Sequence, residues 1–193
     1  VIMCTSAARS SQNWVIDHGK LLDRGLKGIR AEAQDRLAEL TSPFDLTQKA
    51  PFLEAVIITC DALSTWARRY SEKALEMGAV EKDPRRKAEL LEIADVCAWV
   101  PENPCRSFRD AMQAQWFSQC FSRLEEMIGG DINQGRMDQY FYPTYKKDIE
   151  EGRITPEAAQ ELFQCLWLNM MQSIESQMSP ALAKGREGFS HHE

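Results

Sequence analysis

Apolar residues recur three or four positions apart along most of this 193-residue chain, which is the spacing of helices that bury one face. Alternation of apolar and polar residues, the mark of a half-buried strand, is weak throughout. We therefore expect a mainly helical chain. The pattern predicts helices over residues 15–40, 52–78, 84–100, 108–128 and 157–178. Residues 41–51 are expected to form a loop, and residues 138–151 a short, partly helical connector that Gly152 ends.

The fourth predicted helix has clear start and stop signals. Ser107 is a candidate N-cap, with Asp110 three residues later in a variant of the capping box. Gly129 and Gly130 end the helix, because glycine tolerates the left-handed backbone conformation that finishes helices. About 21 residues at ~1.5 Å each make a rod of roughly 30 Å, which is long enough to cross a domain.

The first predicted helix contains Gly25 and Gly28. A glycine inside a helix costs roughly 1 kcal/mol relative to alanine. We therefore expect close packing against a neighbouring segment to explain these two glycines.

The last predicted helix is apolar on almost every side. A helix of this kind is buried in something larger. The residues after it turn polar and stop without a closing element, and the chain starts without an initiator methionine. We therefore interpret residues 1–193 as one partial domain with both ends truncated.

The loop after the fourth helix is the most suggestive stretch for a binding site. Residues 131–135 are small or polar, as in a pocket wall where backbone approaches a ligand closely. Several hydrogen-bonding side chains then crowd into seven positions: Arg136, Asp138, Gln139, Tyr140 and Tyr142. From composition alone, a helix end followed by a charged surface turn explains this stretch as well.

Composition narrows the partners. The net charge is −6 and the isoelectric point is near 5.2, which argues against nucleic acid because phosphate binding needs a basic face. No run of 18 apolar residues occurs, so we expect no membrane span. The six cysteines lie far apart without a C-x-x-C pair, which indicates reduced thiols in a cytoplasmic protein.

A long motif of mixed residue types carries a family resemblance. It begins with Asn103–Pro104–Cys105–Arg106–Ser107–Phe108–Arg109 and ends with GRMDQYFYPTYKKDIEEGRIT, and residues 17–29, 83–101 and 157–169 continue it. This pattern resembles the pyruvate formate-lyase-like region of the glycyl radical enzymes. Cys105 departs from it, since alanine is more usual there.

The resemblance implies a ten-stranded α/β barrel, of which this chain would be the helical part. It implies a cysteine on a loop inside the barrel and a glycine near the far C-terminus. A separate activating enzyme, which uses an iron–sulfur cluster and S-adenosylmethionine, takes hydrogen from that glycine. The glycyl radical then converts the cysteine to the thiyl radical that attacks the substrate, and no bound cofactor is needed.

Neither reactive centre matches a residue of this chain. The glycine motif of the family does not occur, and none of the six cysteines falls at the thiyl position. We assign no catalytic residue, and we expect this segment alone to be inactive.

The resemblance does place candidate pocket residues, which are Gly130, Asp131, Asn133, Gln12, Asn13 and His18. The diol-dehydrating members carry a His-Ser pair at the positions of Gly130 and Asp131, so a polyol substrate of that type is not expected. Asp131 could orient a substrate donor or cap a turn. His18 lies near the expected pocket entrance, although a histidine at a helix start is more often a surface or capping residue.

Other motif residues are interpreted as structural. The family shares Arg136, Asp138, Gln139 and Tyr140 regardless of reaction, which indicates scaffolding of the barrel. His191, His192 and Glu193 are not interpreted as a metal site, because adjacent histidines on an extended chain point in opposite directions.

The expected function is that of part of a glycyl radical enzyme of anaerobic metabolism, a lyase or an enzyme that forms carbon–carbon bonds. The phrase QAQWFSQCFSRLEE with GRMDQY favours members that add hydrocarbons to fumarate or decarboxylate aryl acetates. The expected partners are a small-molecule substrate and the radical activating enzyme, and a homodimer stays open. The alternative is a non-catalytic helical interaction or scaffold domain.

Overall fold

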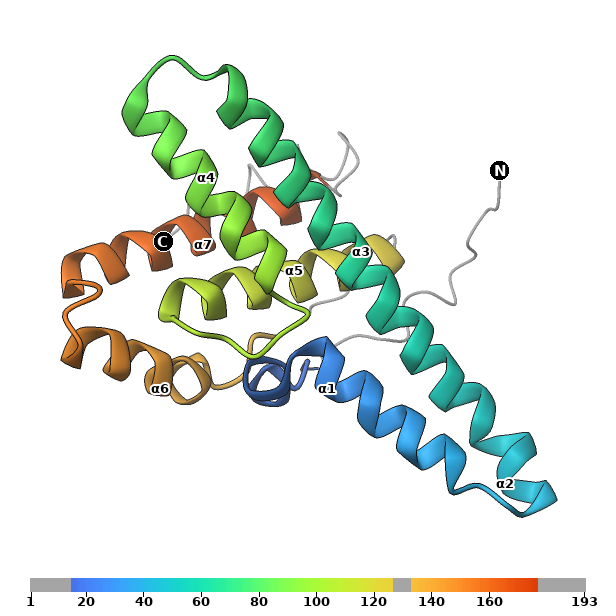
Figure 1. Cartoon of the computed structure of the whole chain (residues 1–193). Coiled ribbons are helices and arrows are strands. Elements are labelled where there is room, and N and C mark those ends of the chain that lie inside the picture. Colours follow the sequence, from blue (N-terminus) through green and yellow to red (C-terminus); the bar gives the residue numbers. More distant parts are fainter. Residues whose placement is uncertain (1–14, 127–132, 177–193) are drawn as a thin grey trace, which may run out of the picture.

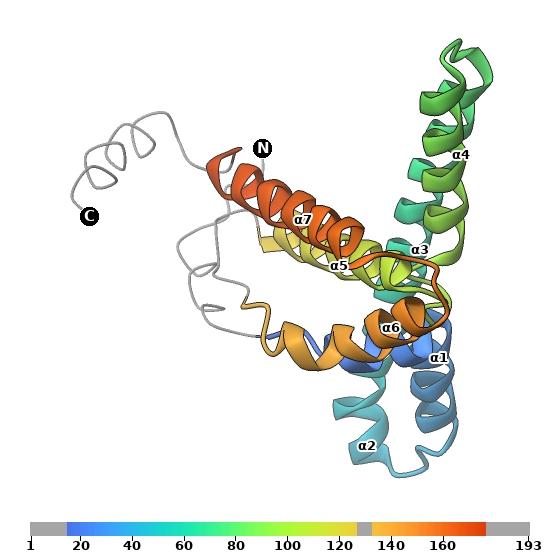
Figure 2. The ribbon, with the colours of Figure 1, turned by 90° about the vertical axis from the view of Figure 1, so that its left-hand side faces the viewer.

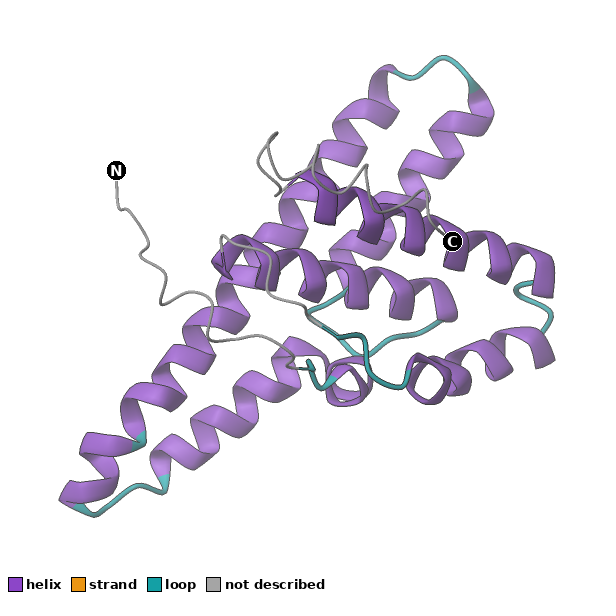
Figure 3. Cartoon of the chain, turned by 180° about the vertical axis from the view of Figure 1, so that it is seen from behind, coloured by secondary structure: helices purple, strands orange, loops and turns teal. Residues whose placement is uncertain are grey.

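The computed structural model describes residues 15–126 and 133–176, and seven helices account for nearly all of them (Figure 1). The helices are α1 (His18–Ala38), α2 (Pro43–Gln48), α3 (Ala50–Val80), α4 (Pro84–Trp99), α5 (Phe108–Glu126), α6 (Met137–Glu150) and α7 (Pro156–Ser176). Within the described ranges the one β-type contact is a parallel bridge between Val15 and Asn133, and Figure 3 shows helices and loops alone. The mainly helical prediction is confirmed.

The helices α3 and α4 form a hairpin whose tip stands away from the other elements (Figures 1 and 2). The hydroxyl of Ser71 on α3 is buried in this hairpin and donates a 2.8 Å hydrogen bond to the Ala94 carbonyl of α4. The other half of α3 packs along α1, where Arg30 forms an ion pair with Asp61. The helix α3 therefore connects two arms of the structure.

The helix α5 lies between two hydrophobic cores. One core joins α5 to α6 and α7, and Figure 2 shows α5 beside α7 with α6 below them. The other core joins α5 to α1 and α3 through Phe117, which is 2% exposed and lies edge-on to Trp66 with ring centroids 5.4 Å apart. The apolar residues of this helix are thus divided between two sets of neighbours.

Gly25 explains how α1 meets the loop between α4 and α5. Its φ of +64° breaks the helix, and a Cβ at this position would lie 2.4 Å from the carbonyl oxygen of Glu102. The break frees two backbone N–H groups, of Leu26 and Lys27, which donate 2.9 Å hydrogen bonds to the carbonyls of Pro101 and Glu102. The prediction of close packing at Gly25 is confirmed, and the positive φ adds a second reason for glycine.

Two predicted connectors are more helical than expected. The loop prediction for residues 41–51 is wrong because Ser42 caps α2, with Pro43 at its first position. The stretch 138–151 is a full helix, since Phe141 packs edge-on against Phe108 of α5 and Phe163 of α7. Gly152 follows this helix with a φ of +66°, as its predicted role as terminator requires.

The helix α7 exposes large apolar side chains on its outer side. Leu166 and Met170 are buried, whereas Trp167, Leu168 and Met171 are 47%, 63% and 55% exposed. Beside them, α6 and α7 together with Phe108 of α5 line an open apolar groove of about 580 Å³. The described elements cover one side of α7 only, and the interpretation of the chain as a partial domain stays a prediction.

The helix α3 is long and apolar enough, by length and composition alone, to cross a membrane. One such helix is weak evidence, because the core helix of a water-soluble protein passes the same test. Both halves of α3 pack against other helices, α1 on one and α4 on the other. We therefore interpret α3 as a packing helix.

Candidate functional site

The bridge between Val15 and Asn133 brings together the two stretches that hold the predicted pocket residues. Gly135 lies two residues after Asn133 with a φ of +65°, and a Cβ there would lie 2.9 Å from Cγ1 of Val15. The segments therefore approach each other closely at this point. Four of the predicted pocket residues lie outside the described residues, namely Gln12, Asn13, Gly130 and Asp131. The described members of the set are Asn133, which is exposed, and His18.

His18 is buried, so the alternative that it is a surface or capping residue is wrong. It is 1% exposed at the first position of α1, where α5 and α6 cover it. The capping role belongs to Asp17, whose carboxylate accepts a 3.0 Å hydrogen bond from the backbone N–H of Lys20. The Nδ1 atom of His18 lies 3.4 Å from the hydroxyl of Ser118, and its ring centroid lies 5.1 Å from that of Tyr140. Burial lowers the pKa of His18 to about 4, against a smaller opposing effect of Asp17, so the imidazole is neutral at pH 7.

Three glutamines, of which Gln134 is half-buried and the other two are fully buried, form an amide cluster beside His18. Gln115 and Gln119 lie one turn apart on α5, and both are 0% exposed. The Nε2 group of Gln115 donates a hydrogen bond to Oε1 of Gln134, and Nε2 of Gln134 donates one of 2.9 Å to Oε1 of Gln119. The hydroxyl of Tyr140 on α6 donates a 3.0 Å hydrogen bond to the backbone carbonyl of Gln134. The cluster thus fixes residue 134, next to the bridge, to both α5 and α6.

Three buried polar atoms of this cluster have no hydrogen-bond partner among the described residues. They are Nε2 of His18, Oε1 of Gln115 and Nε2 of Gln119. An unpaired buried polar atom costs roughly 1–3 kcal/mol, so native structures contain few of them. Their concentration at the meeting point of the two pocket segments marks this region as the candidate site.

The residues predicted to scaffold the barrel divide between surface and interior. Arg136 and Asp138 form an exposed ion pair of 2.7 Å with each other, and Gln139 is also exposed. Tyr140 is half-buried, with its ring against Phe141 at 4.6 Å between centroids. Within the described part of the chain, Tyr140 is the member of this group that connects different elements.

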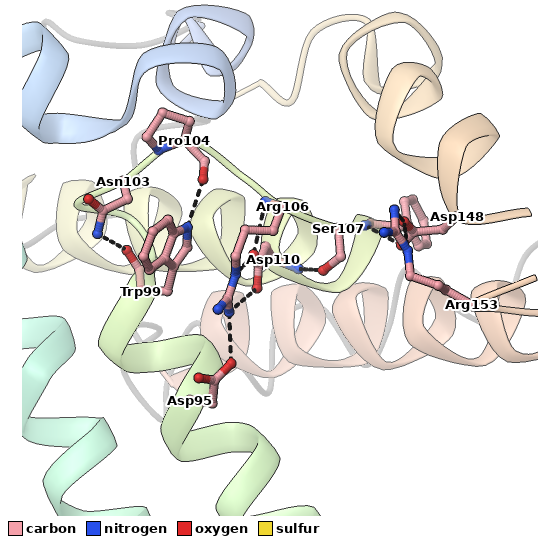
Figure 4. A network of polar contacts seen from close by, with 10 residues as sticks. Asp95, Trp99, Asn103, Pro104, Arg106, Ser107, Asp110, Asp148 and Arg153 are labelled. Atoms are coloured by element: carbon pink, nitrogen blue, oxygen red, sulfur yellow. Dashed lines mark hydrogen bonds and ion pairs between the residues drawn. The ribbon is translucent and has the colours of Figure 1, made fainter. Parts of the chain in front are cut away.

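A polar network anchors the start of α5 (Figure 4). The hydroxyl of Ser107 accepts a 3.1 Å hydrogen bond from the backbone N–H of Asp110, which confirms the predicted N-cap. The carboxylate of Asp110 is buried and accepts from the Arg106 guanidinium at 2.8 Å. Asp148 of α6 accepts from the backbone N–H of Phe108 at 2.7 Å and pairs with Arg153 at 2.6 Å. This network positions α5, and thereby Gln115 and Gln119, relative to α6.

The thiols of Cys60 and Cys97, which are buried, and of Cys105, which is half-buried, have the character of packed side chains. Burial raises the pKa of Cys97 to about 11 and that of Cys105 to about 12, and it also raises the pKa of Cys60. A thiol that stays protonated is a poor nucleophile. The described residues hold no group of three metal-binding side chains, and His191, His192 and Glu193 lie outside the described ranges.

The comparisons with known proteins identify the family. The family model "Pyruvate formate lyase-like" matches residues 1–191. The chain is 53% identical to the isethionate sulfite-lyase of Oleidesulfovibrio alaskensis over 98% of its own length and 23% of that relative, and 46% identical to that of Bilophila wadsworthia over the same shares. A solved structure on 1,2-propanediol dehydration in Roseburia inulinivorans matches 82% of this chain and 19% of its own chain, at 40% identity and a TM-score of 0.79.

The chain therefore belongs to the pyruvate formate lyase-like family, and its relatives are glycyl radical enzymes. Its helices are the helical part of that barrel fold. A curated dehydratase of the family, trans-4-hydroxy-L-proline dehydratase of Clostridioides difficile, is 35% identical over 75% of the chain. The chain spans about a quarter of the length of the isethionate sulfite-lyases it matches.

Sequence reasoning missed the three glutamines of the cluster. Gln115 and Gln119 are four residues apart, so one helix face must carry both. That face is otherwise the apolar one, with Met112 and Ala111 one turn before them. The sequence pattern that could have revealed them is this pair of amide side chains, four residues apart on an otherwise apolar helix face.

Proposed function

We propose that this chain is part of a glycyl radical lyase that cleaves the carbon–sulfur bond of a small hydroxyalkanesulfonate, isethionate, and releases sulfite. The supporting observation is the difference in identity within one family. Two isethionate sulfite-lyases match 98% of the chain at 53% and 46% identity, whereas the hydroxyproline dehydratase matches 75% of it at 35%. Members of one family share the fold, so the residues that select the substrate are among those that differ between members. Higher identity to the isethionate sulfite-lyases therefore favours their substrate.

The reaction balances without an external oxidant. A thiyl radical takes a hydrogen atom from the carbon that carries the hydroxyl group of 2-hydroxyethanesulfonate. The neighbouring carbon–sulfur bond then breaks, with loss of the hydroxyl proton, to give hydrogen sulfite and the radical of acetaldehyde. That radical recovers the hydrogen atom from the thiol, so the products are acetaldehyde and hydrogen sulfite. A cavity that excludes water and oxygen protects such radicals.

The loop chemistry agrees with this proposal. By the resemblance, Gly130 and Asp131 take the positions of the His-Ser pair of diol-dehydrating members, and we take the chain to lack the hydroxyl-binding pair of those enzymes. Aryl-acetate decarboxylation has weaker support, since an indoleacetate decarboxylase of Tractidigestivibacter scatoligenes is 30% identical over 82% of the chain, against 53% for the isethionate sulfite-lyase of Oleidesulfovibrio alaskensis. The relatives described here do not support fumarate addition. The carbon–sulfur lyase replaces both as the leading hypothesis.

The partners follow from the proposed reaction. The radical is installed by a separate activating enzyme that uses S-adenosylmethionine and an iron–sulfur cluster, and no other cofactor is bound. The reactive cysteine and glycine belong to parts of the polypeptide that these 193 residues do not include. The chain alone is inactive, and the complete enzyme works in the cytoplasm.

The test is an anaerobic assay of the complete protein that contains this chain, after activation. Isethionate should yield equal amounts of sulfite and acetaldehyde, while 1,2-propanediol and trans-4-hydroxy-L-proline should yield no product. The 193-residue chain serves as the inactive control. A protein that forms its radical, yet turns over one of the comparison substrates and not isethionate, would contradict the proposal.

A further inference from the structure

Gln134 joins its own segment to α5 and to α6 through its side chain and its backbone. Its side-chain amide lies between those of Gln115 and Gln119 on α5, and its carbonyl accepts from Tyr140 on α6. A residue bonded at both ends has little freedom to shift. The backbone next to Gln134 therefore has a fixed position relative to α5 and α6.

The segment at the start of α1 is held in place by the same cluster. Asn133, which precedes Gln134, forms the parallel bridge with Val15. Three residues after Val15, His18 contacts the ring of Tyr140 and the hydroxyl of Ser118, which lies between the two glutamines of α5. The same cluster thus holds both segments of the candidate site.

The cluster is a poor choice for stability alone. Leucine side chains of similar size would fill the same space and leave no buried amide atom without a partner. With glutamines, Oε1 of Gln115 and Nε2 of Gln119 stay unpaired among the described residues. Hydrogen bonds restrict the orientation of a loop more strictly than apolar contacts do. The glutamines therefore fix the orientation of the segment that contains Gln134.

We propose that Gln134 is a positioning residue for the substrate pocket. Its bonds to Gln115 and Gln119 hold the backbone of residues 133 and 134 against α5, so that this segment meets Val15 in one register. Gln134 itself takes no part in the chemistry. The inference rests on the proposed function, since it takes the pocket to lie where these two segments meet.

The experiment uses the complete, activated protein and three variants. Gln134→Leu removes both side-chain hydrogen bonds at nearly constant volume, and Gln119→Leu removes one of them. Gln34→Leu, on the exposed side of α1, is the matched control. For Gln134→Leu we expect the KM for isethionate to rise about tenfold, because the pocket would hold the substrate less well. We expect kcat to stay within about threefold of wild type. Gln119→Leu should raise KM less, and Gln34→Leu should change neither constant.

Two further readouts separate positioning from general stability. The yield of the glycyl radical, measured by electron paramagnetic resonance, should match wild type in both cluster variants. The melting temperature of Gln134→Leu should fall, because the substitution leaves Nε2 of Gln115 and Oε1 of Gln119 buried without their partner. Amide hydrogen exchange at residues 15–17 and 133–136 should be about tenfold faster in Gln134→Leu, with α3 and α4 unchanged. An unchanged KM, or a joint loss of radical yield and kcat, would overturn the inference. If Gln134→Leu does not fold, Gln119→Leu decides by the same criteria.

The exchange measurement also separates this inference from the proposed function. A wild-type protein that ignores isethionate overturns the proposed reaction. In that case the positioning role is judged by the exchange rates at residues 15–17 and 133–136, which need no substrate. Unchanged rates there would overturn it.

Discussion

Desolvation lowers the pKa of His18 to about 4 in the folded chain, whereas an unfolded histidine has a pKa near 6.5. Between these values the unfolded chain binds a proton that the folded chain does not bind. Folding stability therefore falls as the pH decreases from about 6.5 to about 4, by at most roughly 1.4 kcal/mol per pH unit.

A His18→Phe substitution tests this acid sensitivity. Phenylalanine keeps a ring against Tyr140 and cannot bind a proton. We expect the unfolding free energy of the variant to increase relative to that of wild type as the pH decreases from 6.5 to 4. Urea unfolding at half-unit pH intervals measures it, and parallel pH curves for the two proteins would contradict the assigned pKa.

Gly25 offers a second test at the scale of one residue. A Gly25→Ala substitution forces an L-residue to a φ of +64° and places its Cβ 2.4 Å from the Glu102 carbonyl oxygen. We expect a loss of about 3 kcal/mol of unfolding free energy or more. Gly19→Ala in the same helix is the matched control, since its Cβ would have an ordinary 3.6 Å neighbour. It should stabilise the chain by at most about 1 kcal/mol. Equal effects at the two positions would rule out the close approach at Gly25.

At the scale of elements, α5 depends on a carboxylate from another helix. Asp148 of α6 is buried and accepts from the first backbone N–H of α5 while it pairs with Arg153. Negative charge at a helix N-terminus is stabilising, and burial strengthens the interaction. The contact therefore links the packing angle of α6 to the position of α5.

An Asp148→Ala substitution should cost about 2–3 kcal/mol, because it leaves a buried N–H group without an acceptor. Glu150→Ala is the control, since Glu150 is exposed and lies 3.8 Å from Lys146. That change should stay within about 0.5 kcal/mol. Denaturant midpoints with unchanged slopes are the measurement. A similar shift in both variants would show that Asp148 does not cap α5.

Sequence reasoning located the long helices well and the contacts between them poorly. Periodicity and the cap at Ser107 were local signals, so they could be read from neighbouring residues. The burial of His18 depends on α5 and α6, which are distant in the sequence, and no local pattern contains that information. The helix α6 was underestimated for the same reason, because its stability comes from aromatic contacts with α5 and α7. The pocket loop was found by resemblance, whereas the glutamines that hold its end were missed.

At the scale of the whole molecule, the exposed apolar side chains of α7 determine whether the isolated chain self-associates. Exposed apolar side chains that lie together promote association in water. We expect the isolated chain to bind a hydrophobic dye and to self-associate in size-exclusion chromatography. Replacing Trp167 and Leu168 by glutamine should reduce both effects, while Glu161→Gln on the same helix should not. A compact wild-type monomer without dye binding would contradict this expectation.

The contact between His18 and Ser118 joins residues 100 positions apart, and the bridge from Val15 to Asn133 spans still more of the chain. Closing so long a loop is entropically costly, whereas the hairpin of α3 and α4 forms from neighbouring residues. The hairpin should consequently form early during folding. The contacts between the segments that contain Val15 and Asn133 should form last. Newly made polypeptide would thus acquire its helices before it acquires a place for a substrate.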